Sequence, residues 1–444
     1  MKKCAKLCQK RRNRKKYPAR YVKYSPYGFP GARMNAQNQV PQALHLYSLT
    51  LPRQQYRVVK LIRALGTVSR GDLAQQLGYS RATVTGLVKD LTERGIIQEI
   101  AAGQPTGGRR AKILDFNADF ATVIGVDMGA TSVDIALANF RGEILLRHQE
   151  LIDVRDGPEP VLTRVVEIAQ DLIRRVPHAG EALRSMGIGV PGPVDFSNGV
   201  LNVPPIMPGW ERYPIRLKIQ ETFPHTTVVV DNDVNIMALG ELRAGAGQGV
   251  DNFIFVKVGT GIGAGIVVGG EIYRGSTGSA GDIGHIQADR HGPVCHCGNI
   301  GCLEAMASGS ALARQAMEAA RDGRSPVLAQ YLASGVRQLT AEHVGAAASA
   351  GDQAAMELIK TSGTLIGGVL AGVVNFFNPS LILIGGGVAN IGTQLLATIR
   401  RGVLSRSLPL STQHLRIDYS PMGEDAGVTG AVALALEHIF VGNP

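Results

Sequence analysis

The hydrophobic positions of the chain first follow a regular pattern in the segment 54–65, where apolar side chains recur at helical spacing. This pattern predicts an amphipathic helix that ends at Gly66. Ser69 has the side chain of a helix N-cap, and the short segment 70–77 after it predicts a second helix that Gly78 closes. Two helices joined by a tight turn are therefore expected at this point of the chain.

A third helix is predicted from its N-cap, Ser80, to about Arg94. Its apolar positions fall on one face: Val84, Leu87, Val88 and Leu91. After it, the segment 96–100 predicts a strand, 103–110 a glycine-rich loop with two arginines, and 112–116 the returning strand. This order of helices followed by a β-hairpin predicts a winged helix-turn-helix within residues 42–117.

The outer face of the third helix and the predicted wing carry groups that can contact DNA. Hydroxyl and basic side chains reach base edges in the major groove, and arginines at a wing reach phosphates. The candidates for DNA contact are Ser80, Arg81, Thr83, Thr85, Lys89, Arg109 and Arg110. The alternative is a three-helix unit that serves packing alone. Because one such module reads few base pairs, DNA binding implies a dimer on a two-fold operator.

Beyond Thr122 the sequence alternates between short apolar runs and helical segments, which predicts a layered α/β fold. The predicted strands are Val123 to Asp127, Val133 to Asn139, Met186 to Val190, Thr227 to Asp231, Phe253 to Val258 and Leu381 to Ile384. The strands that begin at Val123 and Phe253 each open a unit of a hairpin with a glycine turn, which indicates a duplicated lobe. Acidic and glycine residues directly after such strands are where α/β folds bind ligands.

The positive charge of the chain is concentrated at its N-terminal end. The 444 residues include 46 Lys or Arg and 36 Asp or Glu, but residues 1–71 hold 17 of the basic residues and no acidic one. From Phe116 onward, 23 basic and 31 acidic residues give a net charge of −8. The positive end fits nucleic acid, or else it is a basic tail that only aids solubility. Residues 1–41 follow no period and are expected to form a flexible arm.

Composition also bears on the location of the protein. No stretch approaches the roughly 20 uninterrupted apolar residues of a membrane span, and no apolar segment follows the lysine-rich start. A cytoplasmic protein without membrane insertion is therefore expected. Patterned sequence begins only after Met34, so a start of translation at Met34 stays open as an alternative.

Three of the five cysteines lie within eight residues of one another, which indicates a metal site and not a disulfide scaffold. Three thiolates and one imidazole are typical of a closed, tetrahedral zinc site of the structural type, and a closed site argues against zinc catalysis. The predicted ligands are His285, Cys295, Cys297 and Cys302. His291 or His296 is an alternative fourth ligand, and buried cysteines without metal are the alternative to the site as a whole.

Glycine-rich turns follow several predicted strands, and their backbone N–H groups can approach an oxyanion. The phosphate-binding candidates in these turns are Asp127, Gly129, Thr131, Gly259, Thr260, Gly261 and Gly263. Good turns without a ligand are the alternative. Asp233 follows another strand and precedes a helix, where it can act as a general base on a sugar hydroxyl that attacks a γ-phosphate, or merely cap the helix.

Taken in this order, the elements resemble the ROK family, which groups repressors, open reading frames and sugar kinases. The resemblance covers about Gln54 to the C-terminus, and the family signature is satisfied from Val256 through Gly275 and Gly278 to His285. It implies an actin-like, RNase-H-like domain of two lobes, with a sugar in the cleft and a zinc site that braces the sugar-binding loop. It also implies assembly into a homodimer or homotetramer. Members with an added helix-turn-helix are similar to xylose-, N-acetylglucosamine- and glucose-responsive repressors.

The resemblance also implies roles for single residues. The family's sugar-contacting positions fall on Gly192, Asn232, Asp233, His285 and Glu304, and its kinase base falls on Asp233. Asp282 stands where the family usually has glutamate, which leaves the identity of the sugar open. In the first phosphate turn, Ala130 replaces a glycine and Ser132 a lysine, so binding of ATP and Mg²⁺ is expected to be weakened, although the second turn is intact.

The sequence as a whole therefore predicts an α/β protein with a winged helix-turn-helix followed by a two-lobed, sugar-kinase-type domain. The first lobe is expected at residues 118–230 with 426–444, and the second at 231–425. The predicted function is a sugar-responsive regulator, a repressor of carbohydrate-metabolism genes, in which sugar closes the lobes and alters the fit to DNA. The alternatives are an ATP-dependent hexose or N-acetylhexosamine kinase with a DNA-binding domain, and a domain that docks another protein.

Overall fold

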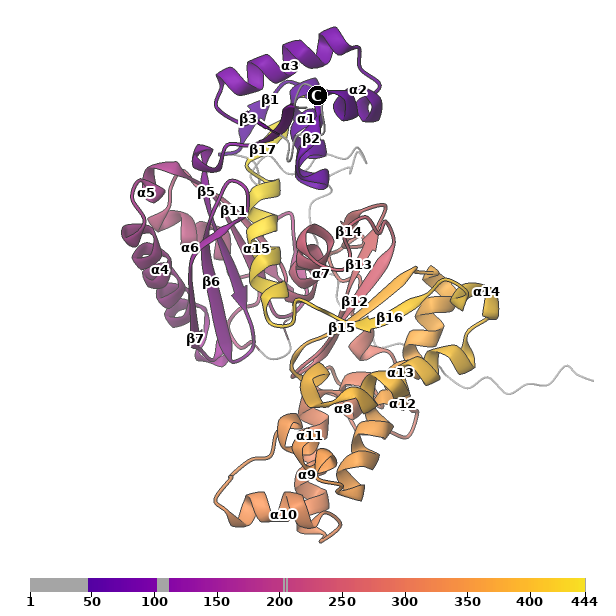
Figure 1. The fold of residues 1–444 in the computed structure, drawn as a ribbon. Helices are drawn as coiled ribbons and strands as arrows, with labels where there is room; N and C mark the ends of the chain where they lie inside the picture. Colours follow the sequence, from indigo (N-terminus) through magenta and orange to yellow (C-terminus); the bar gives the residue numbers. More distant parts are fainter. Residues whose placement is uncertain (1–46, 102–111, 203, 205–206, 444) are drawn as a thin grey trace, which may run out of the picture. The chain divides into compact units, whose positions relative to one another are not determined.

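The computed structural model describes residues 47–101, 112–202, 204 and 207–443. The expected arm at 1–41 and the wing arginines Arg109 and Arg110 lie outside the described residues. Within them, a small helical module is followed by two lobes, each built on a five-stranded sheet (Figure 1). The boundaries at residues 117, 230 and 425 stay predictions.

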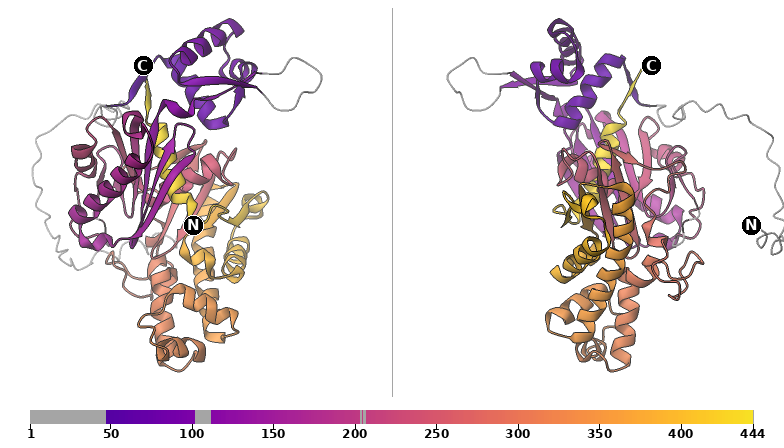
Figure 2. Two further views of the ribbon diagram at one scale, coloured as in Figure 1. Left: turned by 60° about the vertical axis from the view of Figure 1, so that its left-hand side comes forward. Right: turned by 90° about the vertical axis from the view of Figure 1, so that its right-hand side faces the viewer.

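The N-terminal module has the predicted helices and hairpin. Its elements are α1 (Arg53–Leu65), β2 (Val68–Ser69), α2 (Arg70–Leu77), α3 (Arg81–Glu93), β3 (Ile97–Ala101) and β4 (Lys112–Phe116). The predicted caps are confirmed: Ser69 accepts the Asp72 N–H, Gly78 has a φ of 67°, and Ser80 accepts the Thr83 N–H. Strand β4 lies between β2 and β3, so the two arms of the wing start from a paired base (Figure 2).

The first lobe is a mixed sheet in the order β11-β8-β5-β6-β7. Its strands are β5 (Thr122–Met128), β6 (Ser132–Asn139), β7 (Ile144–Leu151), β8 (Leu183–Val190) and β11 (Thr227–Asn232), with the short hairpin β9 (Val194–Asp195) and β10 (Val200–Leu201). Its helices are α4 (Pro158–Arg175), α5 (Ala179–Ala182) and α6 (Ile215–Thr222). On β5, Ile124 and Val126 pack with α4 and α6, whereas Val123 faces the C-terminal helix α15 (Asp425–Glu437). The sheet is therefore covered on both faces.

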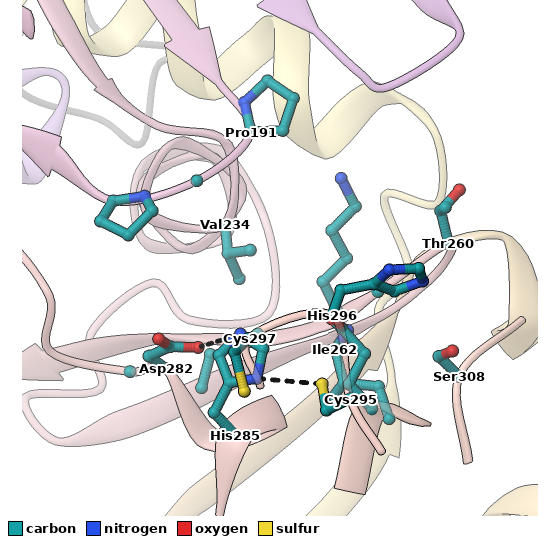
Figure 3. Close-up of a pocket in the computed structure, with 18 of the residues that line it drawn as sticks. Pro191, Val234, Thr260, Ile262, Asp282, His285, Cys295, His296, Cys297 and Ser308 are labelled. Atoms are coloured by element: carbon teal, nitrogen blue, oxygen red, sulfur yellow. Dashed lines mark hydrogen bonds and ion pairs between the residues drawn. The ribbon is translucent and has the colours of Figure 1, made fainter. Parts of the chain in front are cut away.

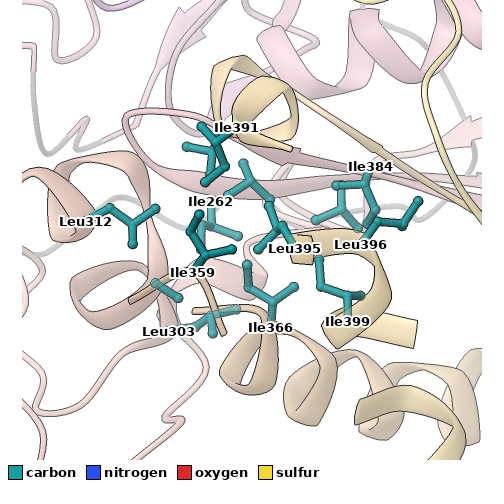
Figure 4. Packing of buried hydrophobic residues seen from close by; sticks show 14 of the residues in the cluster. Ile262, Leu303, Leu312, Ile359, Ile366, Ile384, Ile391, Leu395, Leu396 and Ile399 are labelled. Carbon is teal, nitrogen blue, oxygen red and sulfur yellow. The ribbon is translucent and has the colours of Figure 1, made fainter. Parts of the chain in front are cut away.

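The second lobe has a sheet in the order β14-β13-β12-β15-β16. Its strands are β12 (Phe253–Val258), β13 (Ile262–Val268), β14 (Glu271–Tyr273), β15 (Leu381–Gly385) and β16 (Arg416–Tyr419). Its helices are α7 (Asp233–Ala244), α8 (Leu303–Ala307), α9 (Gly309–Arg321), α10 (Pro326–Ala333), α11 (Ala341–Ser349), α12 (Gln353–Phe377), α13 (Thr393–Arg406) and α14 (Pro409–Thr412). Isoleucines and leucines of α12, α13 and the sheet form its core (Figure 4).

The two sheets share one topology, as the repeated hairpin pattern predicted. In each sheet the central strand, β5 or β12, pairs antiparallel with the next strand of its hairpin. On its other side it pairs parallel with β8 or β15, which in turn pairs parallel with an edge strand. A glycine turn follows the carboxyl end of each central strand. The first glycine turn, at residues 129–131, follows β5, and the second glycine turn, at residues 259–263, follows β12. The fold therefore repeats one unit of sheet and turn.

The N-terminal module and the first lobe share one hydrophobic core. Strand β1 (Leu49–Leu51) pairs parallel with β17 (Phe440–Gly442), which follows α15. The buried side chains of α1 and α3 belong to the same cluster as Phe140, Leu436 and Phe440. Arg63 of α1 donates to the Phe140 carbonyl at 2.8 Å and lies over its ring, and burial lowers the pKa of this arginine to about 9. The C-terminal end of α15 is thus part of the support of the helix-turn-helix.

Helix α12 is long and apolar enough, by length and composition, to cross a membrane. Its apolar face, however, includes Ile359, Ile366 and Leu370, which are fully or almost fully buried in the core of the second lobe. Small residues at Gly363 and Gly367 let α13 approach closely. The contacts of α12 are those of a core helix.

Candidate functional site

A cleft of about 580 Å³ brings together residues that lie far apart in the sequence (Figure 3). Its walls come from the turn after β8, the start of α7, the β12–β13 hairpin, the loop 278–285 and helix α8. All of the predicted sugar-contacting residues line it: Gly192, Asn232, Asp233, Asp282, His285 and Glu304. The structure therefore gathers this set at one place.

Asn232 ties the turn after β8 to the start of α7. Its Nδ2 donates to the Gly192 carbonyl at 2.9 Å, and its Oδ1 accepts the N–H groups of Val234 and Asn235 as the N-cap of α7. Gly192 has a φ of +101°, a conformation that favours glycine. Asn232 therefore holds the cleft wall in position as much as it faces the cleft.

Glu304 binds the second glycine turn directly. Its Oε2 accepts the Ile262 N–H at 2.9 Å, and a Cβ on Gly261 would collide with the same oxygen. Glycine at this position is therefore required for the close approach of the carboxylate. Helix α8, which carries Glu304, is fixed to the β12–β13 hairpin through this contact.

Asp282 and His285 lie at the ends of the short 3-10 turn η4 (Ile283–His285). The Asp282 side chain is 45% exposed, and its Oδ1 lies 3.8 Å from His285 Nε2. The other ring nitrogen, Nδ1, lies 3.6 Å from Cys295 Sγ. One nitrogen of His285 thus faces Cys295 while the other faces Asp282.

The four predicted metal ligands form a compact cluster. The ligand atoms of His285, Cys295, Cys297 and Cys302 all lie within 4.8 Å of one another. The sulfurs of Cys297 and Cys302 are 3.7 Å apart, and a tetrahedral site with Zn–S bonds of about 2.3 Å requires roughly this separation. Burial raises the pKa of Cys302 to about 12, so a cation is needed to hold its thiolate. The cluster is compatible with a structural zinc ion, and it includes neither His291 nor His296.

The phosphate-binding candidates are divided between the cleft and its surroundings. Thr260, Gly261 and Gly263 line the cleft, whereas Gly259 and the three candidates of the first turn, Asp127, Gly129 and Thr131, are not among its lining residues. The first turn reaches the cleft through Ala130. In the second turn, the Thr260 carbonyl accepts the Ser310 hydroxyl at 2.9 Å.

Three ionisable side chains, those of Lys257, Asp233 and Asp127, lie close enough to influence one another's charge. Lys257 Nζ is 2.6 Å from Asp233 Oδ2, and both side chains line the cleft. Asp127 Oδ1 is buried without a hydrogen-bond partner among the described residues. Burial raises the pKa of Asp127 to about 7, although Lys257 acts in the opposite direction. Burial also lowers the pKa of Lys257, but Asp233 and Asp127 outweigh it, and the net shift is upward.

These residues do not fit a magnesium nucleotide. Proteins usually hold Mg²⁺ through one or two ionised carboxylates together with water and the phosphates of the nucleotide, yet the carboxylate of Asp233 is engaged by an ammonium group. Burial raises the pKa of Asp127 to about 7, so only about half of this carboxyl is ionised at neutral pH. Lys257 is the residue of this group that the sequence analysis left without a role. The signal was available, because a lysine interrupts the otherwise apolar strand β12.

The predicted DNA-contacting residues lie at the start and along the outside of α3. Arg81, Thr85 and Lys89 are exposed, but Thr83 is only half exposed. The threonine hydroxyls bond locally, Thr83 to Ser80 at 2.8 Å and Thr85 to the Arg81 carbonyl at 2.9 Å. Lys89 lies 3.7 Å from Glu93. Arg81 is therefore the cationic residue of this face that is most free to contact DNA, since Lys89 lies beside an acidic side chain.

Comparison with known protein families matches both parts of the chain. The pattern of the ROK family matches residues 123–438, and that of the MarR family matches residues 49–110. A putative xylose repressor from Caldicellulosiruptor sp. (strain Rt8B.4) is 32% identical over 384 residues, which cover 86% of this chain and 95% of that protein. A glucokinase from Thermotoga maritima is 33% identical over 317 residues, covering 71% of this chain and 98% of that protein.

A solved structure gives the same result for the fold. It is described as a ROK family transcriptional regulator, a homolog of the Escherichia coli MLC protein. Its TM-score is 0.74 at 30% identity, and the match covers 87% of this chain and 96% of that one. The predicted fold class, a winged helix-turn-helix followed by a two-lobed actin-like domain, is thereby confirmed.

Proposed function

The chain belongs to the ROK family, and we propose that it is a sugar-responsive transcriptional regulator, a repressor of carbohydrate-metabolism genes in the cytoplasm. The observation that carries this proposal is the core shared by the helix-turn-helix and the first lobe of the cleft domain. A relative named as a putative xylose repressor spans 86% of the chain and supports the same function. The effector is a monosaccharide or a derivative of one, and operator DNA is the macromolecular partner.

The proposed binding site uses the cleft residues in distinct ways. Asp282 and the Nε2 atom of His285 face the cleft and bind sugar hydroxyls. Asn232 and Glu304 position the walls, because their polar atoms also bind the backbone of the turns. His285 and the three cysteines would hold a structural zinc ion, and the loop that carries Asp282 would then be fixed by these ligands. A site closed by four protein ligands would supply rigidity and no chemistry.

A continuous series of packed helices connects the cleft with the DNA-binding module. Helix α7 begins at the cleft with Asp233, and a Cβ on Gly430 of α15 would collide with the Ile236 carbonyl of α7. The backbones of α7 and α15 are therefore in direct contact. The far end of α15 lies in the shared core with α1 and α3. Closure of the lobes around sugar shifts α15 and changes the spacing of two recognition helices in a dimer.

Selection of DNA by the purified protein tests this function. Duplexes that bind are selected from a random pool, and a panel of monosaccharides and N-acetylated sugars is then titrated against the best duplex. The same panel is measured by thermal unfolding, where a sugar at about 100 times its Kd adds roughly 2.7 kcal/mol. We expect the sugar that raises the unfolding midpoint to release the duplex. If the protein selects no sequence, or if no sugar changes its binding, the proposal fails.

A sugar kinase is the second candidate, because Asp233 lines the cleft beside the second glycine turn and a glucokinase is 33% identical. Asp233 would then take the proton of a sugar hydroxyl as it attacks the γ-phosphate. Release of ADP that depends on sugar and is abolished in Asp233→Asn would establish this activity. The ion pair of Asp233 with Lys257 favours the regulator instead.

A further inference from the structure

Lys257 places a positive charge inside the cleft next to the first residue of α7. Its ammonium group lies 2.6 Å from Asp233 Oδ2, and its side chain is only 21% exposed. The other oxygen of Asp233, Oδ1, accepts the Val234 N–H at 2.9 Å. Both oxygens of this carboxylate are therefore engaged by the protein itself.

The sheet leaves room for the lysine at this point. The cross-strand neighbours of Lys257 are Gly263 on β13 and Gly385 on β15, so no side chain stands beside it on either strand. A Cβ on Gly263 would lie 3.1 Å from Val234 of α7, which places this face of the sheet against the start of that helix. The long side chain of Lys257 thus runs between glycines toward Asp233.

We propose that Lys257 is a specificity-determining residue that excludes a divalent cation, and with it the nucleotide that the cation would accompany, from the cleft. This inference rests on the proposed sensor function and explains why the cleft binds without phosphorylating. The ammonium repels a metal ion at the place where Asp127 and Asp233 would hold it. It also donates to the oxygen of Asp233 that would have to accept the proton of a sugar hydroxyl.

Binding of Mn²⁺ tests the proposal without any sugar or DNA, so its outcome is independent of the test of the regulator function. Mn²⁺ takes the same oxygen ligands as Mg²⁺, and the loss of the free-ion electron paramagnetic resonance signal measures the bound fraction. We compare the wild type with Lys257→Met and with Lys218→Met. Lys218 is a matched control, since its side chain is 28% exposed and its Nζ pairs with Glu159 at 3.1 Å outside the cleft.

We expect Lys257→Met to bind Mn²⁺ at least about tenfold more tightly than the wild type, because a neighbouring unit charge has been removed. Lys218→Met should behave as the wild type does, and adding Asp127→Asn to Lys257→Met should abolish the gain. An unchanged affinity in a Lys257→Met protein that still unfolds cooperatively overturns the proposal. If the methionine variant does not fold, Lys257→Gln replaces it in the same comparison. Tight binding of Mn²⁺ with the non-hydrolysable analogue AMP-PNP by the wild type also overturns it.

Discussion

Asn232, Asp233 and Glu304 each use polar atoms on contacts within the protein: a carbonyl, an ammonium group and a backbone N–H. A ligand in this cleft therefore meets walls whose hydrogen bonds are already largely made. Asp282 is different, because within the described part of the chain the only polar contact of its side chain is the 3.8 Å approach to His285. Since the resemblance to the family implies that an aspartate replaces the usual, longer glutamate here, we expect the choice of sugar to depend most strongly on this position.

Arg81 is the residue of α3 that we expect to read bases. It is exposed at the first position of the recognition helix, where guanidinium groups bind guanine edges. Arg81→Ala should cost about 1–3 kcal/mol on the selected duplex and little on random DNA. Fluorescence anisotropy with both duplexes measures the difference. Arg321→Ala removes the same charge from the exposed end of α9 and should change neither affinity. An equal loss on both duplexes for Arg81→Ala would contradict base reading.

Asp127 should make the stability of the protein depend on pH. Burial raises its pKa from 3.8 to about 7, so the folded protein keeps this proton up to about pH 7 while the unfolded chain releases it near pH 4. Within that window the folded state binds more protons, and the free energy of unfolding falls as pH rises, by about 1.4 kcal/mol for each unit of the pKa shift. Below about pH 4 the stabilisation that comes from the protonated Asp127 is fully present, and above about pH 7 it is lost.

Asp127→Asn removes this dependence, and denaturant unfolding between pH 4 and pH 8 measures it. The wild type should lose stability relative to the variant as pH rises through the window. Asp322→Asn changes an exposed aspartate and should leave the pH profile as it is in the wild type. Parallel profiles for the wild type and Asp127→Asn would show that Asp127 ionises normally in the folded protein.

At the scale of elements, the loop between η4 and α8 depends on the cysteine cluster for its shape. It has only isolated β-bridges, such as Gln287 with Cys302, and exposes Val294 and Ile300. A loop with so little regular structure is fixed by its ligands. Because His285 belongs to both the cluster and the cleft, the order of the loop and the binding of sugar are coupled.

Cys302→Ser should therefore lose both zinc and sugar binding. Elemental analysis should find about one zinc ion per chain in the wild type and none in the variant. The unfolding midpoint of the variant should no longer respond to the effector, while its helical circular dichroism remains. Cys8→Ser, which changes a cysteine outside the cluster, should keep the zinc ion. Retention of a full zinc ion by Cys302→Ser would remove this cysteine from the ligand set.

The elements with strong local signals were the ones that the sequence predicted well. Strand β12 was predicted with its observed bounds, Phe253–Val258, because an apolar run is limited there by a polar segment and a glycine. The helices of the N-terminal module were predicted to within about a residue, since Ser69, Gly78 and Ser80 cap them. The sugar-contacting set came from the resemblance to the family, and all of its members line the cleft.

Elements that depend on distant partners were not predicted. Strand β1 has three residues and forms only because β17, almost 400 residues later, pairs with it. The ion pair of Lys257 with Asp233 joins the sheet of the second lobe to α7 and follows from no local pattern. The predicted exposure of Thr83 is only partly correct, since its hydroxyl turns toward the Ser80 cap. In each case tertiary contacts decide what the local sequence leaves open.

At the scale of the whole molecule, the regulator depends on α15 because its two ends serve different sites. Its first turn lies against Asp127, where a Cβ on Gly427 would collide with the carboxylate. Its last turn carries Leu436, which is buried in the core shared with the helix-turn-helix. A rigid helix transmits a displacement from one end to the other only if side chains are tightly packed around both ends.

Leu436→Ala should therefore weaken the coupling between effector and DNA. Removing a buried leucine costs about 2–5 kcal/mol of stability and leaves a cavity that absorbs movement of the helix. The ratio of DNA affinities with and without the effector, which typically lies between about 5 and 150 in allosteric proteins, should fall toward one. Titration of the selected duplex in both conditions measures this ratio.

A second variant separates the loss of coupling between effector and DNA from a loss of stability alone. Leu370→Ala removes a buried leucine from the core of the second lobe, away from the shared core, and should lower stability by at least as much. It should leave the ratio of DNA affinities unchanged, because α15 and its contacts with α1 and α3 stay intact. If both variants reduce the ratio to the same extent, the signal does not pass through the end of α15, and the coupling must be carried by contacts elsewhere between the lobes.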